Sequence, residues 1–176
     1  MTVATLVLLL VLSVAAPPSW WRALLPGDTV RDVWAVGLLV LLGAAAVAAV
    51  ASGPASTRWL QASVVAAALL AALCGGGPVT EAVLRRASRG STPAIDPPDG
   101  PVVLRGGAWI GALERLGVCG SVLVAWPEGL AVVLAVKGLG RYPELRYPGA
   151  SERFIIGTLS SVLWAGAAAG VAVLVV

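Results

Sequence analysis

The sequence predicts an all-α fold, a polytopic membrane helix bundle with about six transmembrane helices. Of its 176 residues, 59% are hydrophobic and 12% are charged, whereas soluble domains are about 45–50% apolar and about 25% charged. The mean hydropathy of the chain is +0.92. This composition also excludes an intrinsically disordered chain, because disorder combines low hydrophobicity with high net charge.

Six apolar runs carry this prediction. A helix that crosses a bilayer needs about 20 residues, within a range of about 17–25. The second, fourth and sixth runs reach that length, and the other three need flanking residues to cross. Cys74-Gly-Gly-Gly-Pro78 is expected to end the third helix, because Gly and Pro are poor helix formers. The expected helices span about 2–16, 33–52, 59–78, 107–126, 128–145 and 154–176.

The first run has two interpretations. Ser13-Val14-Ala15 resembles the small-residue cleavage site of a signal peptide, but the run lacks the basic segment that precedes such peptides. We therefore expect a retained helix.

A turn is predicted between the fourth and fifth helices, where Trp126-Pro-Glu-Gly129 has the residue pattern of a type I turn. This turn predicts an antiparallel hairpin of the fourth and fifth helices with Glu128 exposed.

Basic residues alternate between the connections. The connections at 17–32, 79–106 and 141–153 hold most of the cations, while 53–58 holds Arg58 alone. Because basic loops stay on the cytoplasmic side, both termini are expected outside the cell. The high content of Ala, Val and Gly, and of Arg over Lys, favours a bacterial source, so the predicted location is a bacterial cytoplasmic membrane.

A proline-rich stretch predicts the domain organisation. Residues 91–101, STPAIDPPDGP, contain four prolines and cannot form a helix. Residues 91–106 are therefore expected to be a cytoplasmic linker between two membrane halves, residues 1–90 and 107–176. The halves would have opposite topologies, as in inverted-repeat transporters, but they share no sequence similarity.

The composition excludes several kinds of site. The chain has no His and two Cys, so we expect no metal site, no cofactor and no enzymatic activity. Its cations flank apolar runs, which is typical of contact with lipid headgroups and not with nucleic acid. The expected partner is the lipid bilayer, while a second copy or another membrane protein stays open. Four carboxylates are expected in solvated loops: Asp28, Asp32, Asp96 and Asp99. Of these, Asp32 is expected to cap the second helix before Val33.

The unusual residues lie in the second half. Glu114 falls about 10 Å inside the membrane at 1.5 Å per residue from Gly107, and ionisable groups at such depth usually face other helices and pair. Lys137 is expected at a similar depth on the descending fifth helix. We therefore predict an intramembrane polar cluster of Glu114, Arg115, Lys137, Arg141 and Glu152.

Small residues accompany this cluster. Gly107 and Gly111 share a helix face with Glu114, and Gly166 and Gly170 form a second GxxxG pattern. Stripes of this kind let membrane helices approach closely, so these four glycines are predicted packing positions. Two interpretations of the polar cluster stay open: a site for an ion, a proton or an anionic substrate, and an ion pair that fixes helix register.

Four pieces of the second half carry a family resemblance. They are GAWIGALERL at 107–116, AVK at 135–137, RY at 141–142 and ERFIIGTLSS at 152–161. Together they resemble the C-terminal segment of a family of bacterial multi-pass membrane proteins with no assigned activity. The resemblance implies that the residues of the polar cluster act as a set. The first helix of that family contains His and Asp, and this chain has no His.

These observations predict an integral membrane protein of unknown biochemical role that acts through helix–helix interaction or assembly. The alternative is a small transporter or channel-like protein that uses an intramembrane Glu/Lys site.

Overall fold

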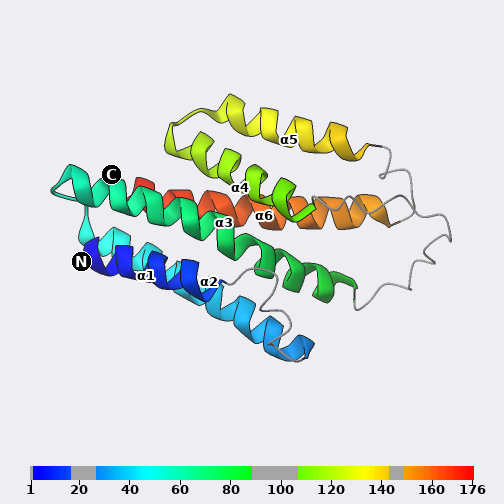
Figure 1. Ribbon diagram of the computed structural model, residues 1–176, viewed down its shortest axis with the longest axis horizontal. Coiled ribbons are helices and arrows are strands. Elements are labelled where there is room, and N and C mark those ends of the chain that lie inside the picture. Colours follow the sequence, from blue (N-terminus) through cyan, green and yellow to red (C-terminus); the bar gives the residue numbers. More distant parts are fainter. Residues whose placement is uncertain (1, 17–26, 89–106, 143–148) are drawn as a thin grey trace.

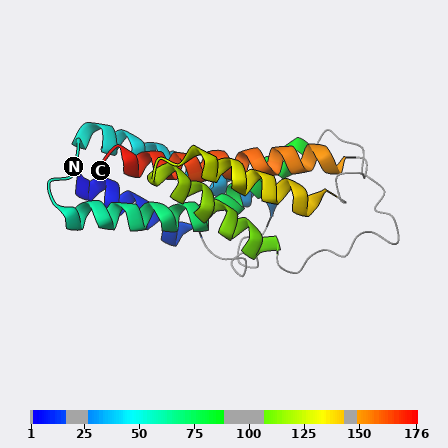
Figure 2. The same ribbon diagram turned by 90° about the horizontal axis from the view of Figure 1, so that it is seen from above.

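The computed structural model describes residues 2–16, 27–88, 107–142 and 149–176, and this part of the chain is a bundle of α-helices. The helices lie roughly along one long axis (Figures 1 and 2). Six helices are described: α1 Thr2–Ala15, α2 Asp28–Ser52, α3 Arg58–Ser88, α4 Gly107–Leu123, α5 Pro127–Arg141 and α6 Ala150–Val173. The all-α helix bundle predicted from composition and hydropathy is therefore confirmed.

The centre of the bundle is the antiparallel pair of α3 and α6. Each contributes a stripe of buried alanines, including Ala68 and Ala72 from α3 and Ala165 and Ala169 from α6. Small side chains let two helices approach closely, which is how membrane helices gain packing contacts. Because α3 belongs to the first predicted half and α6 to the second, the two halves share one core.

The remaining helices surround this pair. The helices α1 and α2 pack on one side of it, while α4 packs against both α3 and α6. The fifth helix, α5, packs against α4 and lies on its outer side (Figure 1). Gly129 is the one buried residue of α5, so this helix is peripheral.

The chain alternates between the two ends of the bundle. Both termini lie at the same end as the α2–α3 connection (Figure 1). The backbone N–H of Ala55 in that connection donates to the Val175 carbonyl at 2.7 Å, and Gln61 Nε2 donates to the Val176 carbonyl at 3.3 Å. These contacts hold the end of α6 against the α2–α3 connection.

Within the described residues, three helices are long and apolar enough to cross a membrane: α2, α3 and α6. The helices α1, α4 and α5 have 14, 17 and 15 residues. Large apolar side chains are exposed on many outward faces, including those of Val14, Val47, Trp59 and Leu163. A soluble monomer rarely exposes contiguous apolar surface on this scale, whereas a lipid-facing surface requires it.

Several helix boundaries differ from the predicted ones. The second helix begins at Asp28 and not at residue 33. Asp32 therefore lies within it, and its carboxylate accepts a hydrogen bond from Arg85 of α3. The third helix does not end at Pro78 but continues to Ser88. The fourth ends at Leu123 and the sixth begins at Ala150. The predicted linker at 91–106 and the end of the predicted fifth helix at 143–145 lie outside the described residues.

Candidate functional site

The structure brings Glu114 and Lys137 together between α4 and α5. The Lys137 ammonium donates a hydrogen bond to Glu114 Oε2, so the pair is a charge-assisted contact. The side chains are only 15% and 18% exposed. This is the contact that depth and helix periodicity predicted. Because both groups are shielded from solvent, their mutual attraction is the main compensation for the desolvation cost of the two charges.

The α4–α5 turn sets the register of this pair. The N–H of Trp126 donates to the Ser121 carbonyl at 2.8 Å, and the N–H of Gly129 donates to the Trp126 carbonyl at 3.2 Å. A Cβ added at Gly129 would lie 2.4 Å from the Trp126 ring and 2.6 Å from Ser121 Oγ. The turn therefore requires glycine at 129. It also forms the predicted hairpin, with Glu128 exposed.

Arg115 does not join the Glu114–Lys137 pair, which corrects the single cluster that the sequence predicted. Consecutive residues of an α-helix point about 100° apart, so Arg115 turns toward α3 when Glu114 faces α5. Its Nε and Nη2 donate to the Leu73 carbonyl of α3 at 3.3 and 3.1 Å. The two adjacent charges of α4 thus hold this helix to two different neighbours.

The glycines of α3 make room for Arg115 and for Trp164 of α6. A Cβ at Gly76 would lie 2.2 Å from Arg115 Cδ, and a Cβ at Gly75 would lie 2.2 Å from the Trp164 ring. Trp164 is buried, and its Nε1 donates to the Ala71 carbonyl at 3.0 Å. We call Arg115, Trp164, Gly75 and Gly76 the glycine crossing. No feature of the sequence pattern singled out Trp164.

The glycine crossing explains why the predicted helix terminator is wrong. Pro78 lacks an N–H and so cannot donate to the Cys74 carbonyl four residues earlier. Isolated propensities would end the helix here. In the bundle, Arg115 of α4 and Trp164 of α6 lie against Gly76 and Gly75 on one face of the continuous helix. Tertiary contact therefore overrides local propensity between Cys74 and Pro78.

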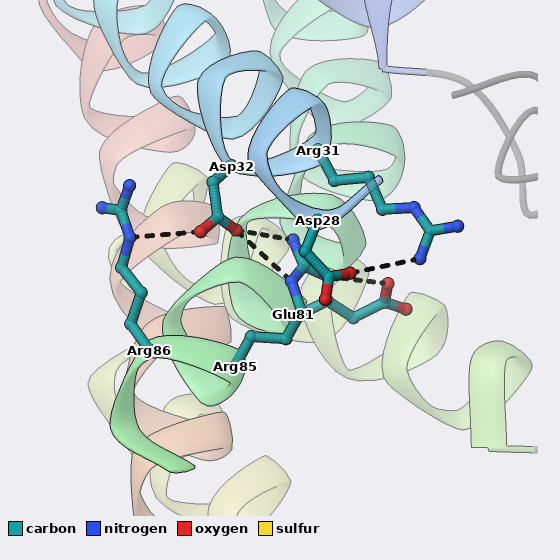
Figure 3. Close-up of polar contacts among 6 residues, drawn as sticks. All are labelled: Asp28, Arg31, Asp32, Glu81, Arg85 and Arg86. Atoms are coloured by element: carbon teal, nitrogen blue, oxygen red, sulfur yellow. Dashed lines mark hydrogen bonds and ion pairs between the residues drawn. The ribbon is translucent and has the colours of Figure 1, made fainter. Parts of the chain in front are cut away.

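A second charged network joins the start of α2 to the end of α3 (Figure 3). Arg85 Nη2 and Nε donate to Asp32 Oδ1 at 2.9 and 3.3 Å, and Arg86 Nε lies 3.5 Å from Asp32 Oδ2. The Asp32 side chain is 6% exposed. We call Asp32, Arg85 and Arg86 the Asp32 network. Glu81 flanks it, with an oxygen 4.0 Å from Arg85 Nη1.

The Asp32 network corrects the prediction of a solvated loop carboxylate and N-cap. Asp32 lies one turn inside α2, and its carboxylate accepts hydrogen bonds from α3. Asp28 does remain exposed, in an ion pair of 3.7 Å with Arg31. Two adjacent arginines at one helix end and an Asp near the start of the preceding helix were the available sequence signal. Positive-inside reasoning accounted for those arginines without requiring a partner.

The other predicted site residues take different places. Glu152 is exposed in the first turn of α6, and the Glu114–Lys137 contact does not include it. Arg141, at the end of α5, reaches the start of α4, since its Nη2 would lie 4.0 Å from a Cβ on Gly107. A Cβ at Gly111 would lie 3.3 Å from Arg115 of its own helix, and Gly166 and Gly170 have no atom within 4 Å of an added Cβ.

The shielded charged residues Asp32, Glu114, Arg115 and Lys137 each contact a neighbouring helix. In the described ranges, no three His, Cys, Asp or Glu side chains come together as a metal site. An apolar hollow on the outer surface of α2 is lined by Ala46, Val47, Val50 and Ala51, at the opposite end of that helix from Asp32.

Comparison of the chain with protein-family models, with curated proteins and with solved structures gave no match. The family resemblance of residues 107–161 therefore stays an expectation that rests on the quoted residues alone.

Proposed function

We propose that this chain is an integral membrane protein of the bacterial cytoplasmic membrane that acts through helix–helix interaction and assembly, not through catalysis. The observation that carries this proposal is that two adjacent charged residues of α4 contact two different helices. Glu114 pairs with Lys137 of α5, while Arg115 binds the Leu73 carbonyl of α3. Charged side chains that bind neighbouring helices are typical of residues that fix the register and orientation of helices.

Six membrane spans with both termini outside complete the proposal. The alternation of connections along the bundle supports it, and so does the concentration of arginines at the end opposite the termini. Reporter fusions test the orientation. Fusions after residues 95 and 148 should report the cytoplasm, and fusions after residue 55 and after Val176 should report the outside. The reverse pattern would contradict the orientation.

A double-mutant cycle on Glu114 and Lys137 tests the assembly role. We expect Glu114→Gln and Lys137→Met each to lower the thermal stability of the purified protein, because each leaves one shielded charge without its partner. The double variant should recover most of the loss. Val136→Met is the matched control, since Val136 is exposed on the outer face of α5. Additive losses in the double variant would contradict a structural pair.

A small transporter is the second candidate, because ionisable groups this deep in a membrane commonly mark ion or proton pathways. Its test is a proton or ion flux across proteoliposomes that contain the protein. If Glu114→Gln stays folded while a flux of the unmodified protein disappears, the pair serves transport. If no flux exists in either protein while the double-mutant cycle shows coupling, the assembly role stands.

A further inference from the structure

Two buried hydroxyl groups lie at the contact between α3 and α6. Thr80 Oγ1 of α3 and Thr158 Oγ1 of α6 have no hydrogen-bond partner in the described part of the chain. The two residues share this contact, because a Cβ at Gly157, next to Thr158, would lie 3.9 Å from Thr80 Cγ2. Hydroxyls within helices commonly donate to the carbonyl one turn earlier, as Ser160 does to Ile156. A buried hydroxyl without such a bond is unfavourable and indicates a bound water or ion.

Arg115 brings a positive charge to the same level of the bundle. Its side chain lies over Gly76, one turn before Thr80 on the same face of α3. Its Nε and Nη2 donate to the Leu73 carbonyl, whereas its Nη1 makes no hydrogen bond within the described residues. This Nη1 would lie 3.3 Å from a Cβ on Gly111. Because α3 and α4 run in opposite directions (Figure 1), the turn that holds Gly111 lies beside the turn that holds Thr80.

The charge of Arg115 is not neutralised by a carboxylate among the described residues. The adjacent Glu114 faces α5 and pairs with Lys137. Glu81, on the neighbouring part of α3, lies 4.0 Å from Arg85. Both of these carboxylates therefore have a cation of their own. A cation that is shielded from water without a counter-ion is costly, and a small anion next to the guanidinium would remove much of that cost.

We propose that Thr80, Thr158 and Arg115 bind a monovalent anion of the size of chloride where α3, α4 and α6 meet. A guanidinium can only donate hydrogen bonds, and each threonine hydroxyl has a proton to donate. A set of donors with one positive charge fits an anion, whereas a bound cation requires oxygen ligands that accept. Gly111 and Gly157 face this level without a side chain. The anion would join three helices, which goes beyond the pairwise contacts of the proposed function and does not depend on them.

Chloride binding to the purified full chain tests this site. The protein is prepared in a non-ionic detergent with sodium gluconate, and chloride then replaces gluconate at constant ionic strength, so that the screening of other charges stays the same. The width of the chloride nuclear magnetic resonance signal reports the bound fraction. We expect a broadening that saturates and that bromide reverses by competition. The thermal unfolding midpoint should rise with chloride, because an anion that binds only the folded state stabilises it.

The double variant Thr80→Val with Thr158→Val removes both hydroxyls and keeps the branched shape of the side chains. Neither hydroxyl bonds to another described residue, so the variant should fold and should be at least as stable as the parent protein in gluconate. We expect chloride to bind at least about tenfold more weakly, the factor for a lost hydrogen bond to a charged group. Thr5→Val is the matched control, since Thr5 Oγ1 is also buried without a partner but belongs to α1. It should leave chloride binding unchanged.

The comparison of these variants separates the site from weak binding of chloride to exposed arginines. Equal chloride affinity in the parent protein and in the double variant overturns the inference, because the ion then binds elsewhere. The absence of saturable binding to the parent protein also overturns it. If the double variant then loses stability in gluconate while Thr5→Val does not, a buried water is the partner of the two hydroxyls. If the double variant does not fold, the two single variants decide the matter, and parent-like chloride affinity in both overturns the inference.

Discussion

Two glycine pairs in this molecule have opposite surroundings. Gly75 and Gly76 of α3 lie under the Trp164 ring and the Arg115 side chain, and a Cβ at either would come within 2.2 Å of them. Gly166 and Gly170 of α6 form the familiar GxxxG spacing, yet no atom lies within 4 Å of a Cβ added at either. The comparison teaches that spacing alone does not identify the glycines that a helix contact requires.

The contrast has a physical basis. GxxxG marks a face on which two backbones can approach, but a large side chain from a neighbour can use a glycine surface equally well. In α3 the approaching groups are an indole ring and a guanidinium stem, which bury apolar area and donate to backbone carbonyls. Substitution of Gly by Ala at each position measures the difference directly, because the chemical change is the same.

The largest effect is expected for Gly75→Ala. The new methyl group would overlap the rigid Trp164 ring, so Trp164 must move and lose its hydrogen bond to the Ala71 carbonyl. Overpacking of this kind costs about 1–3 kcal/mol, and a lost hydrogen bond adds about 1 kcal/mol. The gain in helix propensity, about 1 kcal/mol, offsets only part of this. Thermal unfolding of the purified protein measures the loss, and stability equal to that of the parent protein would contradict the crossing.

Gly76→Ala should destabilise the protein less. Its methyl group would meet Arg115 Cδ, which belongs to a flexible side chain that can shift more cheaply than a ring. The expected loss is about 1–2 kcal/mol, chiefly from overpacking and the weakened bond to the Leu73 carbonyl. Gly77→Ala, on the open side of the same turn, is the control and should not destabilise the protein. Equal losses at 76 and 77 would show that backbone flexibility, and not contact, decides the outcome.

The same comparison shows how much the sequence predicts. Hydropathy and helix length identify the apolar helices, and the depth of Glu114 with the helical period predicts its contact with Lys137. The contact of Arg115 could not be predicted in this way, because its partner is a backbone carbonyl, which every residue has. Trp164 was one apolar residue among many in α6. Asp32 resembled a loop residue because α2 begins five residues earlier than the apolar run indicates.

Helix boundaries are predicted wrongly where tertiary contacts oppose the local helix propensity. Gly75, Gly76 and Pro78 lower helix propensity in any isolated segment, yet α3 continues through them to Ser88. The stabilising contacts come from Arg115 of α4 and Trp164 of α6, which lie 42 and 93 residues further along the chain than the carbonyls they bind. No local pattern contains that information.

Gly117→Ala, on the face of α4 that contacts α5, should have an intermediate effect on stability. Its methyl group would lie 2.8 Å from Val133 Cγ2 of α5, so the Val133 side chain or the α4–α5 contact must shift. Because α5 is peripheral, the adjustment should cost about 1 kcal/mol or less after the propensity gain. Thermal unfolding measures this value against Gly120→Ala, whose Cβ has open space. A loss as large as that of Gly75→Ala would mean that α5 is held as rigidly as α3.

The smallest effect is expected for Gly166→Ala and Gly170→Ala, and its sign is the informative part. With open space at both positions, alanine should leave the protein equally stable or stabilise it by up to about 1 kcal/mol through helix propensity. Gly166→Leu separates the two remaining roles of this face, since a large side chain blocks contact with a second copy but is tolerated by lipid. Molar mass by light scattering, with the detergent contribution subtracted, measures the association. A mass that is unchanged by Gly166→Leu assigns the face to lipid, whereas a fall from dimer to monomer restores the predicted packing role and places it between copies of the chain.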